Sequence, residues 1–169
     1  MITGARIHHA FNKVSTTKNA LRYMTKSFVK EPIEPVAGVR ASIIRQFDKD
    51  DVSNFSKLME DKNPIHLSGN FAERTGVIER PVVHASLISG VVETLVGSKL
   101  PGPGSVIIMQ SVRYPAPLYV GDTMRAEVVV SSVKEKFVDL SVECTNMSIE
   151  DNKTVMLGKL TVAVLNKED

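Results

Sequence analysis

The stretch that decides the fold is Val82–Leu100, which reads VVHASLISGVVETLVGSKL. Apolar side chains fall on almost every side of a helical projection of this run, and only His84 and Glu93 interrupt it before Ser98. Its β-branched residues would also permit a strand, but the length of the run favours a helix. The same run is short for a helix that spans a membrane. We predict a helix buried on most sides, whose small residues at positions 85, 86, 89 and 90 would let it approach a sheet closely.

The segments around this helix alternate between apolar and polar residues, which is typical of half-buried strands. A largely apolar strand is expected over 105–114, and alternating strands are expected over 122–130 and 138–145. Two further strands complete the pattern: an imperfectly alternating one over 39–47, and a last one with Met156, Leu160, Val162 and Val164 on one face. One long helix against an antiparallel sheet of about five strands is an α+β arrangement.

Shorter elements are expected between the first strand and the long helix. Asp48 is a typical N-cap for a helix that reaches Met59. Residues 61–66 are expected to form a loop that cannot be helical, because Pro64 lacks a backbone N–H and pushes the preceding residue toward an extended conformation. A short helix that ends at a glycine is expected over 68–75.

The expected loop reads Asp61-Lys62-Asn63-Pro64-Ile65-His66. An Asn-Pro turn folds the chain back on itself, so a carboxylate and an imidazole can face one small volume with an amide beside them. Such a set can move one proton off carbon and another onto oxygen, which suits reversible addition of water across a double bond. An Asp before Asn-Pro is also a common turn former or N-cap, so this local chemistry alone leaves the two interpretations equal.

The motif resembles the D-x-N-P-[ILV]-H signature of the MaoC-like (R)-specific enoyl-thioester hydratases, including Leu67–Ala72 after it. The similarity continues through Pro81–His84, Leu100–Gly104 and Tyr114–Asp122, and covers roughly residues 40 to 165. The last two stretches are most similar to one subgroup, the mitochondrial hydroxyacyl-thioester dehydratases of type 2. The resemblance implies a single hotdog fold, in which the sheet wraps around the long helix. It also implies a homodimer. We expect that the reaction needs no cofactor, and the sequence shows no metal-ligand spacing.

The resemblance further implies a substrate, a (3R)-3-hydroxyacyl thioester that loses water to give a trans-2-enoyl thioester. Asp61 would exchange the proton at C2 and His66 would protonate the departing hydroxyl, and the opposite assignment stays open because coupled groups titrate as a pair. Asn63 would hold that hydroxyl by its side-chain amide, and a backbone N–H near Ala85 would hold the thioester carbonyl. His84 completes the substrate-binding set, as a hydrogen-bonding residue beside the acyl tunnel or, less readily, in contact with substrate.

Two residues depart from the family pattern. Glu60 stands where the family has a glycine before the catalytic aspartate, and Ala85 stands where a glycine follows the histidine of the later motif. A second carboxylate changes the electrostatic surroundings of Asp61, and an added methyl group at position 85 can crowd the thioester.

Residues 1–30 differ from the rest of the chain. They hold six Lys and Arg residues, no Asp or Glu, and many Ser and Thr, with apolar and basic residues on separate helical faces. This composition is typical of a mitochondrial transit peptide, so we predict a matrix protein with a linker over 31–38 and a folded domain over 39–166. Without residues 1–30 the formal net charge changes from +2 to −4, which argues against a nucleic-acid-binding protein.

Composition otherwise fits one globular domain, with 169 residues, 43% hydrophobic residues and 24% charged residues. The single cysteine, Cys144, excludes a disulfide framework within the chain. It lies in an alternating apolar pattern, so a buried and unreactive thiol is expected.

The preferred function is therefore a dehydratase that acts on acyl chains carried by acyl carrier protein in mitochondrial fatty acid synthesis. The nearest alternative is an (R)-specific enoyl-CoA hydratase that serves acyl degradation. A hotdog thioesterase and a hotdog protein that binds acyl thioesters without turnover are the remaining alternatives.

Overall fold

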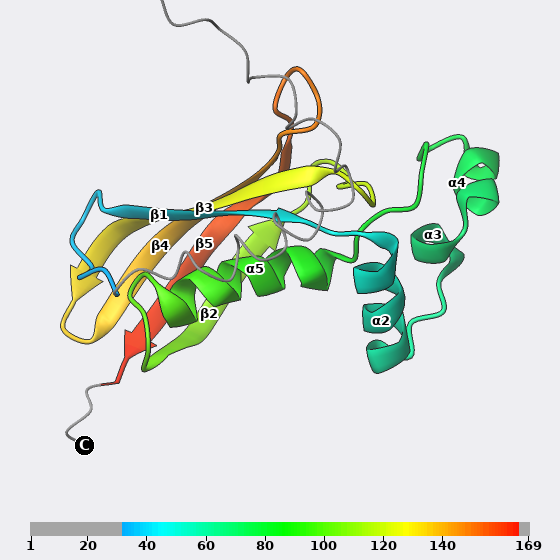
Figure 1. Ribbon diagram of the computed structural model, residues 1–169. Coiled ribbons are helices and arrows are strands. Elements are labelled where there is room, and N and C mark those ends of the chain that lie inside the picture. Colours follow the sequence, from blue (N-terminus) through cyan, green and yellow to red (C-terminus); the bar gives the residue numbers. More distant parts are fainter. Residues whose placement is uncertain (1–31, 166–169) are drawn as a thin grey trace, which may run out of the picture. The chain divides into compact units, whose positions relative to one another are not determined.

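The computed structural model describes residues 32–165, so the transit peptide predicted over residues 1–30 lies outside the described part (Figure 1). A five-stranded antiparallel sheet lies against one long helix, which confirms the predicted α+β hotdog arrangement. The strands are β1 (Arg40–Gln46), β2 (Ser105–Arg113), β3 (Thr123–Lys134), β4 (Phe137–Asn146) and β5 (Thr154–Val164). The helices are α2 (Lys49–Met59), α3 (Pro64–Leu67), α4 (Gly69–Thr75) and α5 (Ala85–Ser98).

The strand order in the sheet is β1-β3-β4-β5-β2, so the first two strands of the chain form its two edges. The three central strands follow one another in hairpins, and their side chains alternate as the sequence predicts: Val128 pairs with Val142, and Leu140 pairs with Leu160. These residues are almost fully buried on the face that carries α5. The opposite faces of the same strands are polar or half-exposed.

Helix α5 lies along one face of the sheet (Figure 1) and supplies Ile88, Val92, Leu95 and Val96 to the core. Burying one such side chain contributes roughly 1.5–3 kcal/mol, so this helix is a major part of the core. The prediction of small residues against the sheet was wrong for most of the set, because Ala85 and Ser86 are exposed. A methyl group placed on Gly90 would also meet nothing within 4 Å.

The long helix begins later than the sequence pattern predicts. It starts at Ala85 rather than at Val82, because Val82 forms an isolated antiparallel bridge with Tyr119. The N–H of Val83 donates to the Leu118 carbonyl at 2.8 Å, which holds the chain in an extended conformation up to the helix. Apolar content alone cannot separate these extended residues from the helix that follows.

The segment from α2 to α4 carries the motif over 61–66. Helix α2 begins as expected at Asp48, whose carboxylate accepts the Asp51 N–H at 2.8 Å in a capping box. The expectation of an entirely non-helical loop was wrong, because Pro64–Leu67 forms one helical turn. Proline suits the first position of a helix, where its missing N–H costs no hydrogen bond and its φ angle is already helical. Asn63 is the N-cap of this turn, with an extended backbone.

The segment before β1 lies against the domain. Residues 32–36, within the predicted linker, have no helix or strand, and the Ile33 N–H donates to the Lys99 carbonyl at 2.8 Å. The Ile33 side chain packs against the hydrophobic core. Across residues 32–165, every helix falls short of the length and apolarity that a membrane-spanning helix needs.

Candidate active site

One carboxylate and two imidazoles meet where α2, α3 and the start of α5 come together. The Oδ2 atom of Asp61 lies 3.8 Å from Nε2 of His66 and 3.5 Å from Nε2 of His84. The two rings stack, with centroids 3.7 Å apart and planes inclined by 21°. The sequence places Asp61 and His66 on one motif, and the fold adds His84 from the segment before α5.

The carboxylate of Asp61 is held by the backbone around it. Its Oδ1 atom accepts the Asn63 N–H at 2.9 Å, and its own N–H donates to the Ser56 carbonyl at 2.9 Å. In this arrangement the other oxygen, Oδ2, faces the two imidazoles. The side chain of Asp61 is 38% exposed, so this oxygen remains accessible to a ligand.

His66 is fixed in one orientation by the segment before α5. Its Nδ1 lies 2.7 Å from the Val82 carbonyl oxygen, which can only accept, so Nδ1 carries the proton of the neutral ring. The Val82 N–H in turn donates to the Ile65 carbonyl at 3.0 Å. A neutral His66 therefore presents the bare lone pair of Nε2 toward Asp61, and its side chain is only 10% exposed.

His84 is the most deeply buried member of the cluster, with 4% of its side chain exposed. Its Nε2 lies 3.2 Å from the Ser56 hydroxyl. The Phe55 ring packs edge-on against the His84 ring, with centroids 4.9 Å apart. Burial is the main cause that lowers the pKa of His84 below its ordinary value, and the neighbouring His66 lowers it further while Asp61 opposes the shift. The His84 ring is therefore neutral near pH 7.

The other two predicted site residues lie next to this cluster in the chain. Asn63 uses its Oδ1 atom to accept the Ile65 N–H at 3.3 Å as the cap of α3, which leaves the side-chain NH₂ group to bind another oxygen. Ala85 is the first residue of α5, where a backbone N–H has no partner inside the helix. This N–H is also at the positive end of the helix dipole, where developing negative charge is stabilised.

Several residues that build the cluster were not predicted. Ser56 follows Val52 by one helical turn on the buried side of α2, and a polar residue on that apolar stripe was the available signal. The backbone carbonyl of Val82 had no signal in the sequence. An Arg80–Asp122 ion pair at 3.0 Å ties the residues before α5 to the start of β3, and Asp122 also accepts the Asn146 amide at 2.8 Å.

The same three side chains could hold a metal ion, because one ligand atom of each lies within 4.8 Å of the other two. A metal on Nε2 of His84 would move the ring proton to Nδ1, which is buried with no hydrogen-bond partner among residues 32–165. A buried donor without a partner costs about 1–3 kcal/mol. The cluster is therefore better suited to proton transfer than to metal binding.

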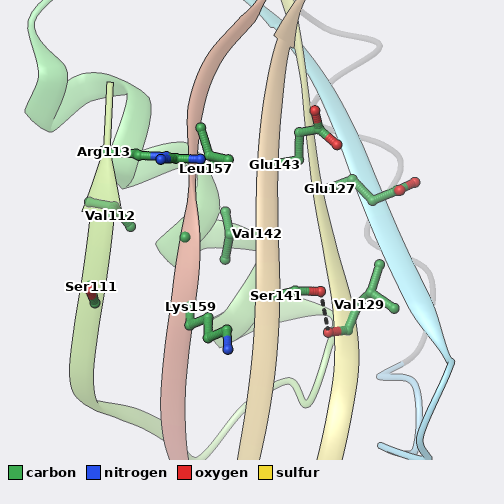
Figure 2. Close-up of a pocket in the computed structure, with 11 residues that line it drawn as sticks. Ser111, Val112, Arg113, Glu127, Val129, Ser141, Val142, Glu143, Leu157 and Lys159 are labelled. Carbon is green, nitrogen blue, oxygen red and sulfur yellow. Dashed lines mark hydrogen bonds between the residues drawn. The ribbon is translucent and has the colours of Figure 1, made fainter. Parts of the chain in front are cut away.

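A hollow of about 580 Å³ lies on the sheet face opposite α5 (Figure 2). Arg113 and Lys159 line it together with Glu127 and Glu143, and none of the three clustered side chains contributes to it. This hollow lies on the outer face of the sheet and is lined by charges of both signs. It is therefore a different place from the cluster around Asp61.

Comparison with known proteins gives the family. Residues 26–152 match the model of the MaoC-like domain. An (R)-specific enoyl-CoA hydratase of Rhodospirillum rubrum is 34% identical over 75% of this chain and 86% of its own length. A mitochondrial 3-hydroxyacyl-[acyl-carrier-protein] dehydratase of Solanum lycopersicum is 30% identical over 73% of this chain and 78% of its own length.

A solved structure agrees with these relatives. The (R)-hydratase of Aeromonas caviae, described as involved in PHA biosynthesis, superposes with a TM-score of 0.71 and 31% identity. The match covers 80% of this chain and 100% of the hydratase chain. The chain therefore belongs to the MaoC-like domain family and is a hydro-lyase of that family.

Proposed function

We propose that this protein removes water from (3R)-3-hydroxyacyl thioesters to give trans-2-enoyl thioesters, and adds water in reverse, with Asp61 and His66 as the proton carriers. The observation that carries the proposal is the 3.8 Å separation of Asp61 Oδ2 and His66 Nε2. This distance is too long for a direct hydrogen bond, so each atom keeps its capacity to exchange a proton with a substrate that contacts both.

Two protons move during dehydration, one from the substrate to Asp61 and one from His66 to the substrate. The Asp61 carboxylate takes the proton from C2, and the electron pair of that C–H bond forms the new double bond as the C3–O bond breaks. A protonated His66 gives its Nε2 proton to the departing hydroxyl, which leaves as water. The pair ends with Asp61 protonated and His66 neutral, which is the starting state for hydration. General acid and base catalysis of this kind contributes about 10²–10⁴-fold.

The thioester carbonyl gains negative charge when the C2 proton leaves. The N–H of Ala85, which has no partner inside α5, is the proposed donor to that oxygen, and the NH₂ group of Asn63 is the proposed donor to the C3 hydroxyl. Donors fixed by a helix end and by a capped turn need no reorganisation as charge develops.

The proposed substrate is carried by acyl carrier protein, and the proposed location is the mitochondrial matrix. Support comes from the basic, acid-free composition of residues 1–30 and from the tomato relative, whose name includes both that carrier and that organelle. The second candidate is hydration of enoyl-CoA, which the Rhodospirillum rubrum relative supports by its name and its somewhat higher identity.

Comparing kcat/KM for one enoyl chain on the two carriers separates these candidates. We expect the value to be at least about tenfold higher on carrier protein, which corresponds to about 1.4 kcal/mol of transition-state binding. Preference for CoA would assign the enzyme to the second candidate. Release of free thiol without hydration would instead indicate a thioesterase, and tight binding with no turnover would indicate a non-catalytic acyl-thioester-binding protein.

The active form is proposed to be a homodimer that pairs through β2. This edge strand has unpaired backbone groups and exposes Val106, Ile108 and Met109, each about half accessible in the single chain. Antiparallel pairing of two β2 strands would join both sheets and cover these side chains in a two-fold symmetric contact. Light scattering after size-exclusion chromatography tests this: the wild type should be a dimer, Ile108→Glu should be a monomer, and a monomeric wild type would contradict the proposal.

A further inference from the structure

His84 has no part in the proton transfers proposed above, yet it contacts both residues that make them. Its Nε2 lies 3.5 Å from Asp61 Oδ2, and its ring stacks on His66 with centroids 3.7 Å apart. Only 4% of its side chain is exposed, so the His84 ring itself is shielded from water. A buried residue that contacts both proposed proton carriers can affect the reaction through them.

The protonation of the His84 ring follows from its surroundings. Nε2 faces the Ser56 hydroxyl at 3.2 Å and the Asp61 carboxylate, and a carboxylate can only accept hydrogen bonds. Nδ1 is buried with no partner among residues 32–165, where an N–H would be left without an acceptor. Both observations place the single proton of the neutral ring on Nε2, between the Ser56 oxygen and Asp61 Oδ2.

We propose that His84 is a positioning residue for the hydration and dehydration reaction, whose Nε2–H orients the Asp61 carboxylate while its ring stacks on His66. The inference rests on the proposed function. Oδ1 of Asp61 is already held by the Asn63 N–H at 2.9 Å, and the polar Nε2–H of His84, with its nitrogen 3.5 Å from Oδ2, attracts the second oxygen. A carboxylate bound at one oxygen and attracted at the other meets the C2 proton in one orientation.

The stacked ring also constrains His66. A neutral partner with its centroid 3.7 Å away keeps the His66 plane within 21° of its own, while the Val82 carbonyl fixes the rotation of the ring within its plane. When His66 becomes an imidazolium during the cycle, a neutral ring beside it avoids the repulsion that a second cation would cause. Burial holds the pKa of His84 below its ordinary value and so keeps that ring neutral.

Two variants of the full-length chain isolate the Nε2–H donor. His84→Gln places an amide N–H near the position of Nε2, and His84→Met has similar length and bulk but no donor. A misplacement of the reacting groups by about 1 Å can cost on the order of 10²-fold in rate. We therefore expect His84→Met to lower kcat by about 10²-fold and His84→Gln to recover at least about tenfold of that loss. KM should stay within about threefold for both, because His84 does not contact the substrate.

The outcomes separate this inference from the function itself. Absence of hydration by the wild-type chain contradicts the proposed function, whereas normal wild-type turnover with fully active His84→Met contradicts only the role of His84. Equal loss in Gln and Met, in proteins with the same melting temperature, overturns the role of the donor. A raised KM at unchanged kcat would return His84 to the residues that contact substrate.

Proton–nitrogen NMR of the wild-type chain tests the same assignment without any substitution. Long-range correlations between the ring nitrogens and the ring carbon-bound hydrogens identify which nitrogen of His84 carries the proton. We expect the proton on Nε2 near neutral pH. A proton on Nδ1 would leave Nε2 unable to donate to Asp61 and would overturn the proposal even if both variants failed to fold.

Discussion

The carbonyl oxygen of Val82 accepts the Nδ1–H of His66 at 2.7 Å, and this contact determines which nitrogen of His66 can react. Val82 belongs to the extended residues just before α5, which are bound to Leu118 and Tyr119 on one side and to Ile65 on the other. The extended segment before the buried core helix therefore positions the motif residue His66 through one backbone carbonyl. The hydrogen bond at Nδ1 fixes the tautomer of the ring and also the direction in which Nε2 points.

Glu60 lies in a conformation that favours glycine, with φ of 55° at the C-cap of α2. A residue with a Cβ in this left-handed region loses roughly 1–2 kcal/mol relative to glycine, and this is partly offset because glycine loses more backbone entropy on folding. We expect Glu60→Gly to raise the free energy of unfolding by up to about 1 kcal/mol in urea titrations. Glu60→Ala keeps the Cβ and should give no such gain; equal stabilisation by both would show that the charge, and not the backbone, is responsible.

Gly158 allows β2 to lie close to β5. A Cβ at this position would come within 2.1 Å of the Ser111 carbonyl oxygen and 2.7 Å of the Val112 Cα atom, both of which are backbone. Gly158→Ala should therefore lower stability by about 1–3 kcal/mol, since the edge strand has to move.

The matched control is Gly97→Ala in α5, where an added Cβ would meet nothing within 4 Å. Better helix propensity should raise stability there by about 0.5–1 kcal/mol. Thermal unfolding of the two variants should shift in opposite directions. A neutral Gly158→Ala would show that the β2–β5 contact is looser than described.

Cys144 is fully buried in β4, and burial is the main cause that raises the pKa of its thiol to about 12, with a contribution from Glu143. The reactive thiolate is therefore nearly absent at neutral pH. We expect no reaction with a thiol-specific reagent in the folded protein and full reaction, one thiol per chain, after unfolding in urea. Rapid labelling of the folded protein would contradict the packing of β4 against the core.

Stability should depend on pH through His84. Burial lowers its pKa in the folded state, so below the ordinary histidine value of about 6.5 the unfolded chain binds a proton that the folded chain does not. The contribution of His84 to the free energy of unfolding is therefore complete above about pH 6.5. It is lost as the pH falls from there toward the lowered pKa of His84 in the folded state. Urea titrations between about pH 8 and about pH 5.5 should show stability falling with acid, and His84→Gln should flatten that slope. Identical slopes for the two proteins would contradict the burial of a neutral ring.

Much of the fold could be predicted because its signals are local. Alternation in β4, the Asp48 cap and the apolar run of α5 each depend on residues that are neighbours in the chain. The start of α5 could not be placed, because Val82 and Val83 are as apolar as the helix but bond to residues near 118 and 119. Such pairing over a long sequence separation leaves no periodic pattern.

The site was predictable only as far as its motif extends. Asp61 and His66 lie five positions apart and meet because one turn, α3, joins them. His84 joins them from a distant part of the sequence, and the contribution of Val82 is a backbone atom that its side chain does not specify. Contacts of both kinds depend on tertiary structure, so the sequence alone shows the proposed pair of proton carriers but not the contacts that hold them.

The measurement that most directly tests the central claim follows the absorbance of a trans-2-enoyl thioester with the full-length wild type, Asp61→Asn and His66→Gln. The wild type should consume the enoyl absorbance and form the (3R)-hydroxyacyl product. Each variant should lose about 10²–10⁴-fold in kcat with an unchanged melting temperature. Glu73→Gln, an equivalent carboxylate-to-amide change on the exposed side of α4, should retain wild-type turnover. Near-normal hydration by a folded Asp61→Asn or His66→Gln would contradict the account.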